Sequence, residues 1–359
     1  MFVRKEPAGH SVWPVYRQPG PNIIIRMKVL LTGATGFLGF RLLEELSRHK
    51  GISGVIASGR TIRPALSVRD PKVSYRLGDL ADAEFADSLT GQADVIIHAA
   101  ARSSPWGRYR DFRVDNTLAT RHLLQAAQRH GTDRIIYVSS SSVYVNGNDR
   151  YDVRESDPLP EKFINHYART KRESELEVIH SGLPYIILRP RALIGRGDTV
   201  IMPRLIHAFK KGKLIRIGRS DPLVDLTPVE NMVAATISAL FVSPNAMNQV
   251  YNIANGRPVL LWESVGKIMG MLGYDFNAGK RIPVRAAMAM ARIMELKSML
   301  TGGAEPPLTV YGVLTLARSF TMNISVARQQ LGYEPRVTAD EAIAEFVHWY
   351  SGQAWKQLH

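Results

Sequence analysis

Short apolar runs and amphipathic stretches alternate along the chain from Met27 to about residue 190. The apolar runs have the length of strands, and the stretches between them have the hydrophobic spacing of helices. Continuous apolar runs are typical of parallel strands that are buried on both faces. The pattern therefore predicts a doubly wound α/β fold, whose ligand lies beyond the carboxyl ends of its strands. The predicted strands are residues 27–32, 54–58, 73–77, 94–98, 134–139 and 184–188.

After residue 190 this alternation weakens, and helical patterns dominate. We expect a nucleotide-binding domain over 27–190 and a smaller, mostly helical lobe over 191–359, with some segments returning to the first domain. Residues 1–26 precede the first strand and lack the apolar core of a secretory signal, so we expect a disordered extension or a misassigned start. The predicted helices of the second lobe are 202–213, 262–273, 284–300 and 339–350.

A glycine-rich turn follows the first predicted strand, with the sequence Thr32-Gly33-Ala34-Thr35-Gly36-Phe37-Leu38-Gly39. It leaves a strand and opens a helix, and this context distinguishes a phosphate-binding turn from an ordinary one. Glycines let the backbone approach a pyrophosphate, and the helix N-terminus offers free amides and partial positive charge. We expect a dinucleotide to be held there by Gly33, Thr35, Gly36, Phe37, Leu38 and Gly39.

The end of the second predicted strand should carry an acid if the dinucleotide is NAD, because that acid binds the adenosine ribose. The sequence there is Ala57-Ser58-Gly59-Arg60, with no carboxylate. Arg60 can pair with a 2′-phosphate, so NADP(H) is favoured and NAD(H) is possible; the alternative is an arginine that faces solvent. After the third strand, Asp79 and Leu80 are candidates for contact with adenine, although Asp79 is equally suited to cap the next helix.

Tyr167 and Lys171 lie on a predicted helix over 161–180. Their i, i+4 spacing places the phenol and the ammonium on one face. A free tyrosine titrates at about pH 10, so acid–base work near neutrality needs help from a neighbouring cation. Such pairs are common on ordinary helices, and a functional interpretation depends on the motifs around them.

A serine run supplies that context at the end of the fifth predicted strand, in Tyr137-Val138-Ser139-Ser140-Ser141-Ser142-Val143-Tyr144. Strand ends are where this architecture places its active site, and a serine hydroxyl there can donate to a substrate carbonyl oxygen. Serine runs are more often turns or helix caps. However, the glycine turn, the serine run and the Tyr–Lys helix occur in the order that the fold requires, and together they favour catalysis.

From Met27 to about Tyr350 the chain resembles the extended short-chain dehydrogenases/reductases, in the group of NAD-dependent epimerases/dehydratases and 3β-hydroxysteroid dehydrogenases. The resemblance implies a Rossmann-type sheet with the pyrophosphate at the glycine turn. It implies Tyr167 as the acid–base, Lys171 as the residue that holds the nicotinamide ribose, and Ser140 as the residue that polarises the reacting C–O bond. Further cofactor contacts that it implies are Ser139, Ala99, Ala100, Ala101 and Pro190.

Several segments resemble a narrower branch, the bacterial 3β-hydroxysteroid dehydrogenase-like proteins and the 2-alkyl-3-oxoalkanoate reductases. These segments are 104–107, 188–198, 251–256 and 331–343. Nucleotide-sugar 4,6-dehydratases carry Thr-Asp-Glu where this chain has Ser140-Ser141-Ser142, so their water-eliminating acid and base are missing. The resemblance implies an NAD(P)-dependent enzyme that interconverts a ketone and a secondary alcohol. A nucleotide-sugar epimerase is the first alternative, and a non-catalytic dinucleotide-binding protein is the second.

Three features favour a largely hydrophobic small-molecule substrate, such as a steroid or a β-keto acid. Ser104 and Trp106 follow the fourth strand near the mouth of the expected site, so they are candidate substrate contacts together with Ser140. The predicted helix 284–300 is rich in methionine, which suits an adaptable apolar wall, although core packing explains it equally well. The narrower resemblance points the same way.

Composition and charge add limits. The 359 residues include no cysteine, which excludes thiolate nucleophiles, zinc–sulfur sites and disulfides, and we expect no metal. The 46 Lys and Arg residues outnumber 32 Asp and Glu residues, for a net charge of +14. These cations are spread along the chain, so we expect no nucleic-acid partner; a solvated basic surface is favoured over attraction to an anionic substrate or to a peripheral membrane face. No apolar stretch is long enough for a transmembrane segment, and we expect a cytoplasmic homodimer.

Overall fold

The computed structural model describes residues 26–276 and 281–352. Its central sheet has seven strands in the order β12-β7-β5-β4-β1-β2-β3, and every neighbouring pair is parallel. This confirms the predicted doubly wound sheet. The strands are β1 Met27–Thr32, β2 Ile52–Gly59, β3 Val73–Leu77, β4 Val95–His98, β5 Arg134–Val138, β7 Tyr185–Pro190 and β12 Gln249–Ile253.

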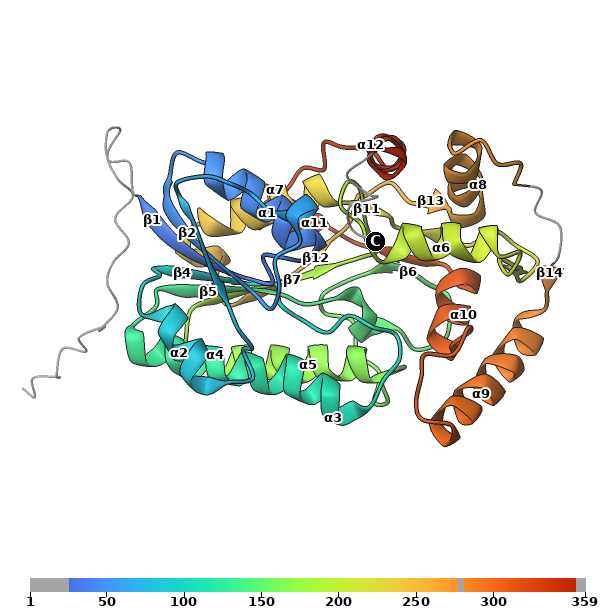
Figure 1. The fold of residues 1–359 in the computed structure, drawn as a ribbon, viewed down its shortest axis with the longest axis horizontal. Coiled ribbons are helices and arrows are strands. Elements are labelled where there is room, and N and C mark those ends of the chain that lie inside the picture. Colours follow the sequence, from blue (N-terminus) through green and yellow to red (C-terminus); the bar gives the residue numbers. More distant parts are fainter. Residues whose placement is uncertain (1–25, 277–280, 353–359) are drawn as a thin grey trace, which may run out of the picture.

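Helices cover both faces of this sheet: α1 and α7 lie above it in Figure 1, and α2, α4 and α5 lie below it. Above the sheet, Leu43 of α1 and Met232 of α7 belong to one buried apolar cluster. Below the sheet, Leu89 of α2 and Leu123 of α4 belong to another. These helices, with the short α3, are α1 Phe37–Arg48, α2 Ala83–Thr90, α3 Tyr109–Phe112, α4 Ala119–His130, α5 His166–His180 and α7 Val229–Leu240.

The direction of winding reverses between β1 and β4, because β2 and β3 extend the sheet on one side and β5, β7 and β12 extend it on the other. Open α/β sheets bind ligands at such a switch point, outside the carboxyl ends of the strands. The glycine turn leaves β1 and the alanine run leaves β4, so both lie at this point.

The second lobe lies to the right of the central sheet in Figure 1, around a further apolar cluster to which Phe40 of α1 and Leu66 also belong. Met202 of α6, Trp262 of α8 and Phe346 of α12 are buried together there. None of the helices within 26–276 and 281–352 is long and apolar enough to cross a bilayer. The remaining helices are α6 Ile201–Lys210, α8 Leu261–Met271, α9 Val284–Leu300, α10 Val310–Ala317, α11 Ser325–Leu331 and α12 Ala339–Ser351.

Short strands connect the two lobes and support the second. A four-stranded sheet has the order β13-β10-β15-β6, and two further pairs are β11 with β8 and β14 with β9. Their bounds are β6 Arg150–Val153, β8 Leu193–Ile194, β9 Arg216–Ile217, β10 Leu223–Val224, β11 Thr227–Pro228, β13 Val259–Leu260, β14 Arg281–Ile282 and β15 Phe320–Met322.

Two sequence predictions are corrected by this fold. The strand predicted at 184–188 does not end the sheet, because β12 pairs with β7 in parallel. The helix predicted at 161–180 begins only at His166, because the Asn165 side chain accepts a hydrogen bond from the Ala168 amide and caps it there. The first strand begins at Met27, as predicted. The expectation for residues 1–26 lies, apart from its last residue, outside the described residues.

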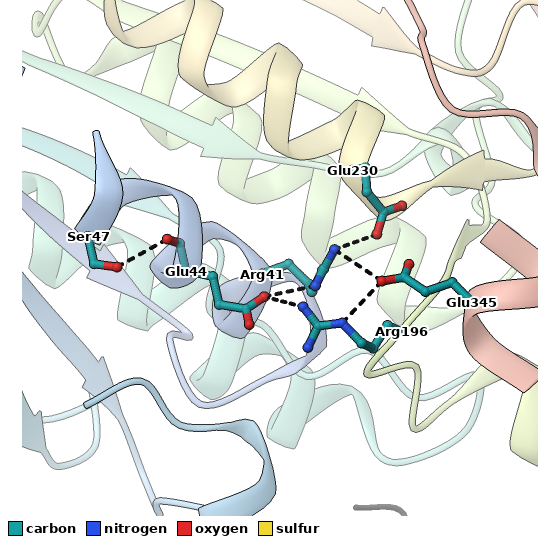
Figure 2. Close-up of polar contacts among 6 residues, drawn as sticks. All are labelled: Arg41, Glu44, Ser47, Arg196, Glu230 and Glu345. Carbon is teal, nitrogen blue, oxygen red and sulfur yellow. Dashed lines mark hydrogen bonds and ion pairs between the residues drawn. The ribbon is translucent and has the colours of Figure 1, made fainter. Parts of the chain in front are cut away.

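An ion-pair network joins α1 to the second lobe, as Figure 2 shows. The Arg41 guanidinium lies 2.8 Å from the Glu44 carboxylate and 2.6 Å from that of Glu230, at the start of α7. Arg196, which follows β8, lies 2.5 Å from Glu44 and 3.1 Å from Glu345 of α12. We call these five residues the junction network.

The junction network holds three carboxyl groups against two guanidinium groups. If every group were ionised, the junction network would carry one excess negative charge at a partly buried position. Burial raises the pKa of Glu230 to about 7, and the neighbouring Glu345 carboxylate acts in the same direction. One retained proton therefore balances the charges of this network near neutral pH.

Candidate active site

The turn between β1 and α1 brings the backbone very close to the residues after β4. Gly33 has a φ of 72°, and a Cβ atom there would lie 2.7 Å from the Ala100 amide nitrogen. A Cβ atom on Gly39 would overlap the Gly33 carbonyl oxygen. The Ala99 amide donates to the Thr32 carbonyl oxygen, which fixes the alanine run against the turn. Only glycine fits the positions of Gly33 and Gly39.

The first turn of α1 has the properties of an anion-binding site. Gly36 is the N-cap, so no side chain caps the helix, and no acid lies in the first turn. The amides of Phe37, Leu38 and Gly39 lie at the positive end of the helix dipole. This arrangement fits the pyrophosphate of a dinucleotide.

Arg60 follows β2 and lies near the glycine turn, because Gly59 packs against the Thr35 side chain. The Arg60 side chain is 63% exposed, and its guanidinium lies 3.6 Å from the Asp115 carboxylate. Asp115 is bound more closely by Arg102, at 2.7 Å. Arg60 is thus loosely held and accessible to a second anion.

Asp79 and Leu80 follow β3. The Asp79 carboxylate accepts a hydrogen bond from the Ala81 amide. The helix cap is Asp82, which accepts from two amides in the first turn of α2, so the alternative role of Asp79 as the cap is wrong. Leu80 is buried.

Ser139 and Ser140 follow β5, and their hydroxyl groups have different partners. The buried Ser139 hydroxyl donates to the Glu175 carboxylate at 2.5 Å. The Ser140 hydroxyl oxygen accepts from the Ser142 amide at 3.1 Å, and this hydroxyl lies close enough to the Tyr167 phenol to lower its pKa. The structure therefore brings Ser140, but not the side chain of Ser139, to Tyr167.

Tyr167 and Lys171 lie one turn apart on α5. Burial raises the pKa of Tyr167 to about 12, against the opposing effect of the Ser140 hydrogen bond, so the phenol is protonated at neutral pH. The buried Lys171 ammonium donates to the Val138 carbonyl oxygen at 2.5 Å and lies 4.2 Å from the centre of the Tyr137 ring. Burial lowers the pKa of Lys171 to about 7.

A fully buried ion pair lies one turn beyond Lys171. Arg189 of β7 donates to both carboxylate oxygens of Glu175, each at 2.7 Å. Arg189 also donates to the Tyr144 hydroxyl at 2.6 Å, and that hydroxyl donates to the Asn252 side-chain oxygen of β12 at 2.9 Å. We call Glu175, Arg189, Tyr144 and Asn252 the buried network.

Sequence reasoning did not assign this network a role. Burial alone would raise the pKa of Glu175, but the hydrogen bonds and charge of Arg189 outweigh burial, and the pKa is lowered. The carboxylate therefore stays ionised and holds Ser139 as well. The available signal was a glutamate at i+4 from Lys171, together with an arginine inside a continuous apolar strand.

The loop after β4 meets the second lobe. The Trp106 indole nitrogen donates to the Gly303 carbonyl oxygen at 3.1 Å, between α9 and α10. The Ser104 hydroxyl donates to the Trp106 carbonyl oxygen at 2.8 Å, so it shapes this loop. Tyr311 of α10 lies near Tyr167, where it adds to the effect of burial in raising the pKa of that phenol. Gly303 and Tyr311 gave no signal in the sequence, since they lie more than a hundred residues beyond Lys171.

The remaining predicted cofactor contacts lie at the same ends of the strands. Ala101 follows β4 and is partly exposed, and Pro190 is the buried last residue of β7. No cluster of three or more acidic or histidine side chains suited to a metal ion occurs in the described part of the chain.

Together, the parallel sheet, the glycine turn and the Ser140–Tyr167 contact beside a buried lysine define an oxidoreductase of the extended short-chain dehydrogenase/reductase type. The chain belongs to the NAD dependent epimerase/dehydratase family, whose model matches residues 29–254.

Relatives named as reductases and dehydrogenases align over nearly the whole chain. The chain is 34% identical to the uncharacterized protein YbjS of Escherichia coli, over 90% of this chain and 97% of that protein. It is 30% identical to a 2-alkyl-3-oxoalkanoate reductase of Stenotrophomonas maltophilia, over 88% and 97% respectively. It is also 30% identical to 3beta-hydroxysteroid-dehydrogenase/decarboxylase isoform 1 of Arabidopsis thaliana, over 90% and 79%.

Among solved structures, the chain is similar to UDP-glucuronic acid 4-epimerase of Bacillus cereus, determined in complex with NAD. The TM-score is 0.70 at 20% sequence identity, over 93% of this chain and all of the other. This likeness supports the fold.

Proposed function

We propose that the protein interconverts a ketone and a secondary alcohol on a largely hydrophobic substrate, with NADP(H) as its preferred cofactor. The observation that carries the proposal is the contact between the Ser140 hydroxyl and the Tyr167 phenol at the carboxyl end of the sheet, with Lys171 one turn away. These three groups match the catalytic set that the family resemblance implies.

In the reductive direction, a nicotinamide cofactor held at the glycine turn would supply the hydride that the carbonyl carbon accepts. Tyr167 is protonated at neutral pH, because its pKa is about 12, so it can give its proton to the substrate oxygen. Ser140 hydrogen-bonds the same oxygen while negative charge gathers there. Lys171 holds the ribose and, when charged, lowers the cost of the phenolate that remains.

The substrate proposal rests on residues at the mouth of the site and on the relatives. Trp106 and Tyr311 supply aromatic surface from the β4 loop and from α10. Relatives that align over most of the chain are named for alkylated keto acids and for steroids. A nucleotide-sugar epimerase remains the second candidate, because the family includes epimerases and the net charge of +14 suits a diphosphate.

The central test is Tyr167→Phe. We expect NADPH affinity to stay within a few-fold, whereas turnover falls by about a hundredfold or more, the usual scale for loss of a general acid. Tyr151→Phe is the matched control, since Tyr151 is exposed on β6 and should leave turnover unchanged. Near-normal turnover in a folded Tyr167→Phe protein would contradict the mechanism.

A second test concerns the cofactor. Because Arg60 is accessible to a phosphate, we expect tighter binding of NADPH than of NADH, and Arg60→Ala should narrow that difference. Fluorescence titration measures both affinities, with Arg285→Ala, an exposed arginine of α9, as the control. Equal affinities for NADPH and NADH in the unmodified protein would mean that Arg60 contacts only Asp115 and solvent.

Isothermal titration separates the two candidate substrate classes. In the presence of NADP⁺, the proposal predicts heat from a long-chain β-keto acid and little from UDP. Tight, salt-sensitive binding of UDP with no response to the keto acid would favour the epimerase.

A further inference from the structure

Helix α9 packs on the body of the protein by one face only. Its buried residues are Ala287, Ala291 and Ser298, and the two alanines pack in a small cluster with Val313 of α10. In Figure 1 the helix lies at the lower right edge of the molecule, far from the central sheet. Nothing in the described residues covers its outward face, because the side chains there remain exposed.

That outward face is apolar, where a surface helix ordinarily is polar. Ile293 is 69% exposed, Leu296 60% and Leu300 78%, and these positions recur at helical spacing on the side opposite the buried alanines. Met290 and Met299 are exposed beside them. Core packing accounts for Met288, which packs against the small cluster, but not for Met290 and Met299. A contiguous apolar surface of this kind marks an interaction site.

Cations flank the apolar stripe on both sides. At 100° per residue, Arg285 and Arg292 lie along one side of the stripe, and Lys297 lies along the other. All three are exposed, and no ion pair holds any of them within the described residues. The single acid of the helix, Glu295, is turned inward and accepts a hydrogen bond from the Val310 amide.

We propose that α9 docks this face on the surface of an anionic lipid bilayer. A preformed helix with an apolar stripe and flanking basic side chains lies in the plane of the interface, with the stripe in the acyl boundary and the cations at the headgroups. The fixed packing of Ala287 and Ala291 means that no folding cost accompanies binding. The net charge of +14 adds a general attraction to the same surface.

A second copy of the chain fits this face less well. Pairing two α9 helices about a twofold axis would set Arg285, Arg292 and Lys297 of one copy against the same three cations of the other. No acid on the outward face would neutralise them. An anionic membrane satisfies both the apolar stripe and its cations.

Docking through α9 has a consequence for the nearby site. Gly303 follows Leu300 closely and accepts the hydrogen bond from Trp106, so the loop after β4 would lie at the membrane surface. An apolar molecule dissolved in the bilayer would then reach this loop without crossing water. The docking itself does not depend on the proposed reaction.

Vesicle sedimentation tests the proposal with the full chain. We expect the protein to sediment with phosphatidylcholine vesicles that contain phosphatidylserine, and much less with phosphatidylcholine alone. The variant Ile293→Glu/Leu296→Glu should lose at least tenfold in affinity, because it charges the centre of the stripe. The control is Leu176→Glu, an exposed leucine of α5, which should bind as the unmodified protein does.

A second variant tests the charge. Replacing Arg285, Arg292 and Lys297 by glutamine should remove most of the preference for phosphatidylserine, at about fivefold in affinity per cation. Absence of sedimentation by the unmodified protein would overturn the proposal, as would equal binding by Ile293→Glu/Leu296→Glu. If light scattering showed instead that this variant turns a dimer into a monomer, the face would be a contact between copies. Thermal melting and NADPH titration of each variant show that the fold and the cofactor site persist.

Discussion

The buried network and the junction network use the same residue types but differ in how completely their charges are matched. In the buried network the Glu175 carboxylate faces the Arg189 guanidinium in a two-point contact, with 0% of Glu175 and 3% of Arg189 exposed, and the partly exposed Arg172 also contacts this carboxylate at 2.9 Å. In the junction network three carboxyl groups share two guanidiniums at partly exposed positions. The first joins α5 to β7 and β12, whereas the second joins the two lobes.

This difference shifts the pKa values of the two networks' glutamates in opposite directions. Matched charges lower the pKa of Glu175 despite its complete burial, so this network keeps one protonation state and one geometry. Burial raises the pKa of Glu230 to about 7, and the neighbouring Glu345 carboxylate acts in the same direction, so that network changes its charge near neutral pH. A network of constant charge suits the region around Ser139 and Lys171, where the geometry has to stay fixed. A contact between lobes can accept a network whose charge changes with pH.

The largest expected effect is that of Arg189→Met, which leaves the Glu175 carboxylate buried without its main partner. We expect a loss of about 3 to 5 kcal/mol in the free energy of unfolding, measured by urea denaturation. The double variant Glu175→Leu/Arg189→Met should recover most of that loss, because it removes both charges. A loss below about 1 kcal/mol in the single variant would show that Arg172 and Ser139 hold Glu175 without Arg189.

The next effect is the pH dependence of the junction network. Glu230 has a pKa of about 7 in the folded state against 4.5 for an ordinary glutamate, so between these values the folded protein binds a proton that the unfolded chain has released. Its contribution to the free energy of unfolding therefore falls as pH rises from about 4.5 to 7. Glu230→Gln should remove this slope and stabilise the protein above pH 7 by about 1 to 2 kcal/mol.

Glu175 should show the opposite sign. Its pKa is lowered, so the stability that it contributes is present above the ordinary value of 4.5 and is lost as pH falls through the folded-state pKa. Urea denaturation of Glu230→Gln and of Glu175→Gln across pH measures how each glutamate changes the pH dependence of the free energy of unfolding. Glu305→Gln, which removes one acid of an exposed ion pair with Arg204, is the control. If the two substitutions changed the pH dependence of the free energy of unfolding with the same sign, the two networks would not differ in the way proposed.

The smallest expected effect is that of Arg196→Gln. This residue pairs with Glu44 and Glu345 at partly exposed positions, so we expect a loss of about 1 kcal/mol or less. The loss should shrink at high ionic strength, whereas the effect of Arg189→Met should not, since salt does not screen a buried pair. Denaturation at low and high salt compares Arg196→Gln with Arg189→Met. If the effect of Arg196→Gln did not depend on salt, the ion pairs of the junction network would behave like the buried Glu175–Arg189 pair.

The central sheet could be predicted from the sequence wherever an apolar run ended at a strong turn. β1 and β3 have the predicted bounds because the glycine turn and Gly78 stop them, and α9 has its predicted bounds because Pro283 precedes it. β12 was not placed in the sheet, because Gln249–Ile253 mixes polar and apolar residues and its partner β7 lies far back along the chain.

The site was predictable where its residues share a local motif and unpredictable where they meet through the fold. The glycine turn, Ser140 and the Tyr167–Lys171 pair are each visible within a few residues of sequence. The pairing of Glu175 with Arg189, or of Trp106 with Gly303, depends on how α5 faces β7 and on where the α9–α10 turn lies. Hydrophobic periodicity carries no information of that kind, and it also missed that α9 turns its leucines outward.

The position of β12 in the chain affects how the protein is made. β7 is complete at Pro190, but its sheet partner ends at Ile253, after the first elements of the second lobe have left the ribosome. At about 5 to 20 residues per second, β7 keeps an open, apolar edge for several seconds of synthesis. An open edge of this kind invites pairing with other chains. A gene fragment cut at the lobe boundary would therefore yield a sheet with one side permanently unfinished, and we expect such a fragment to aggregate.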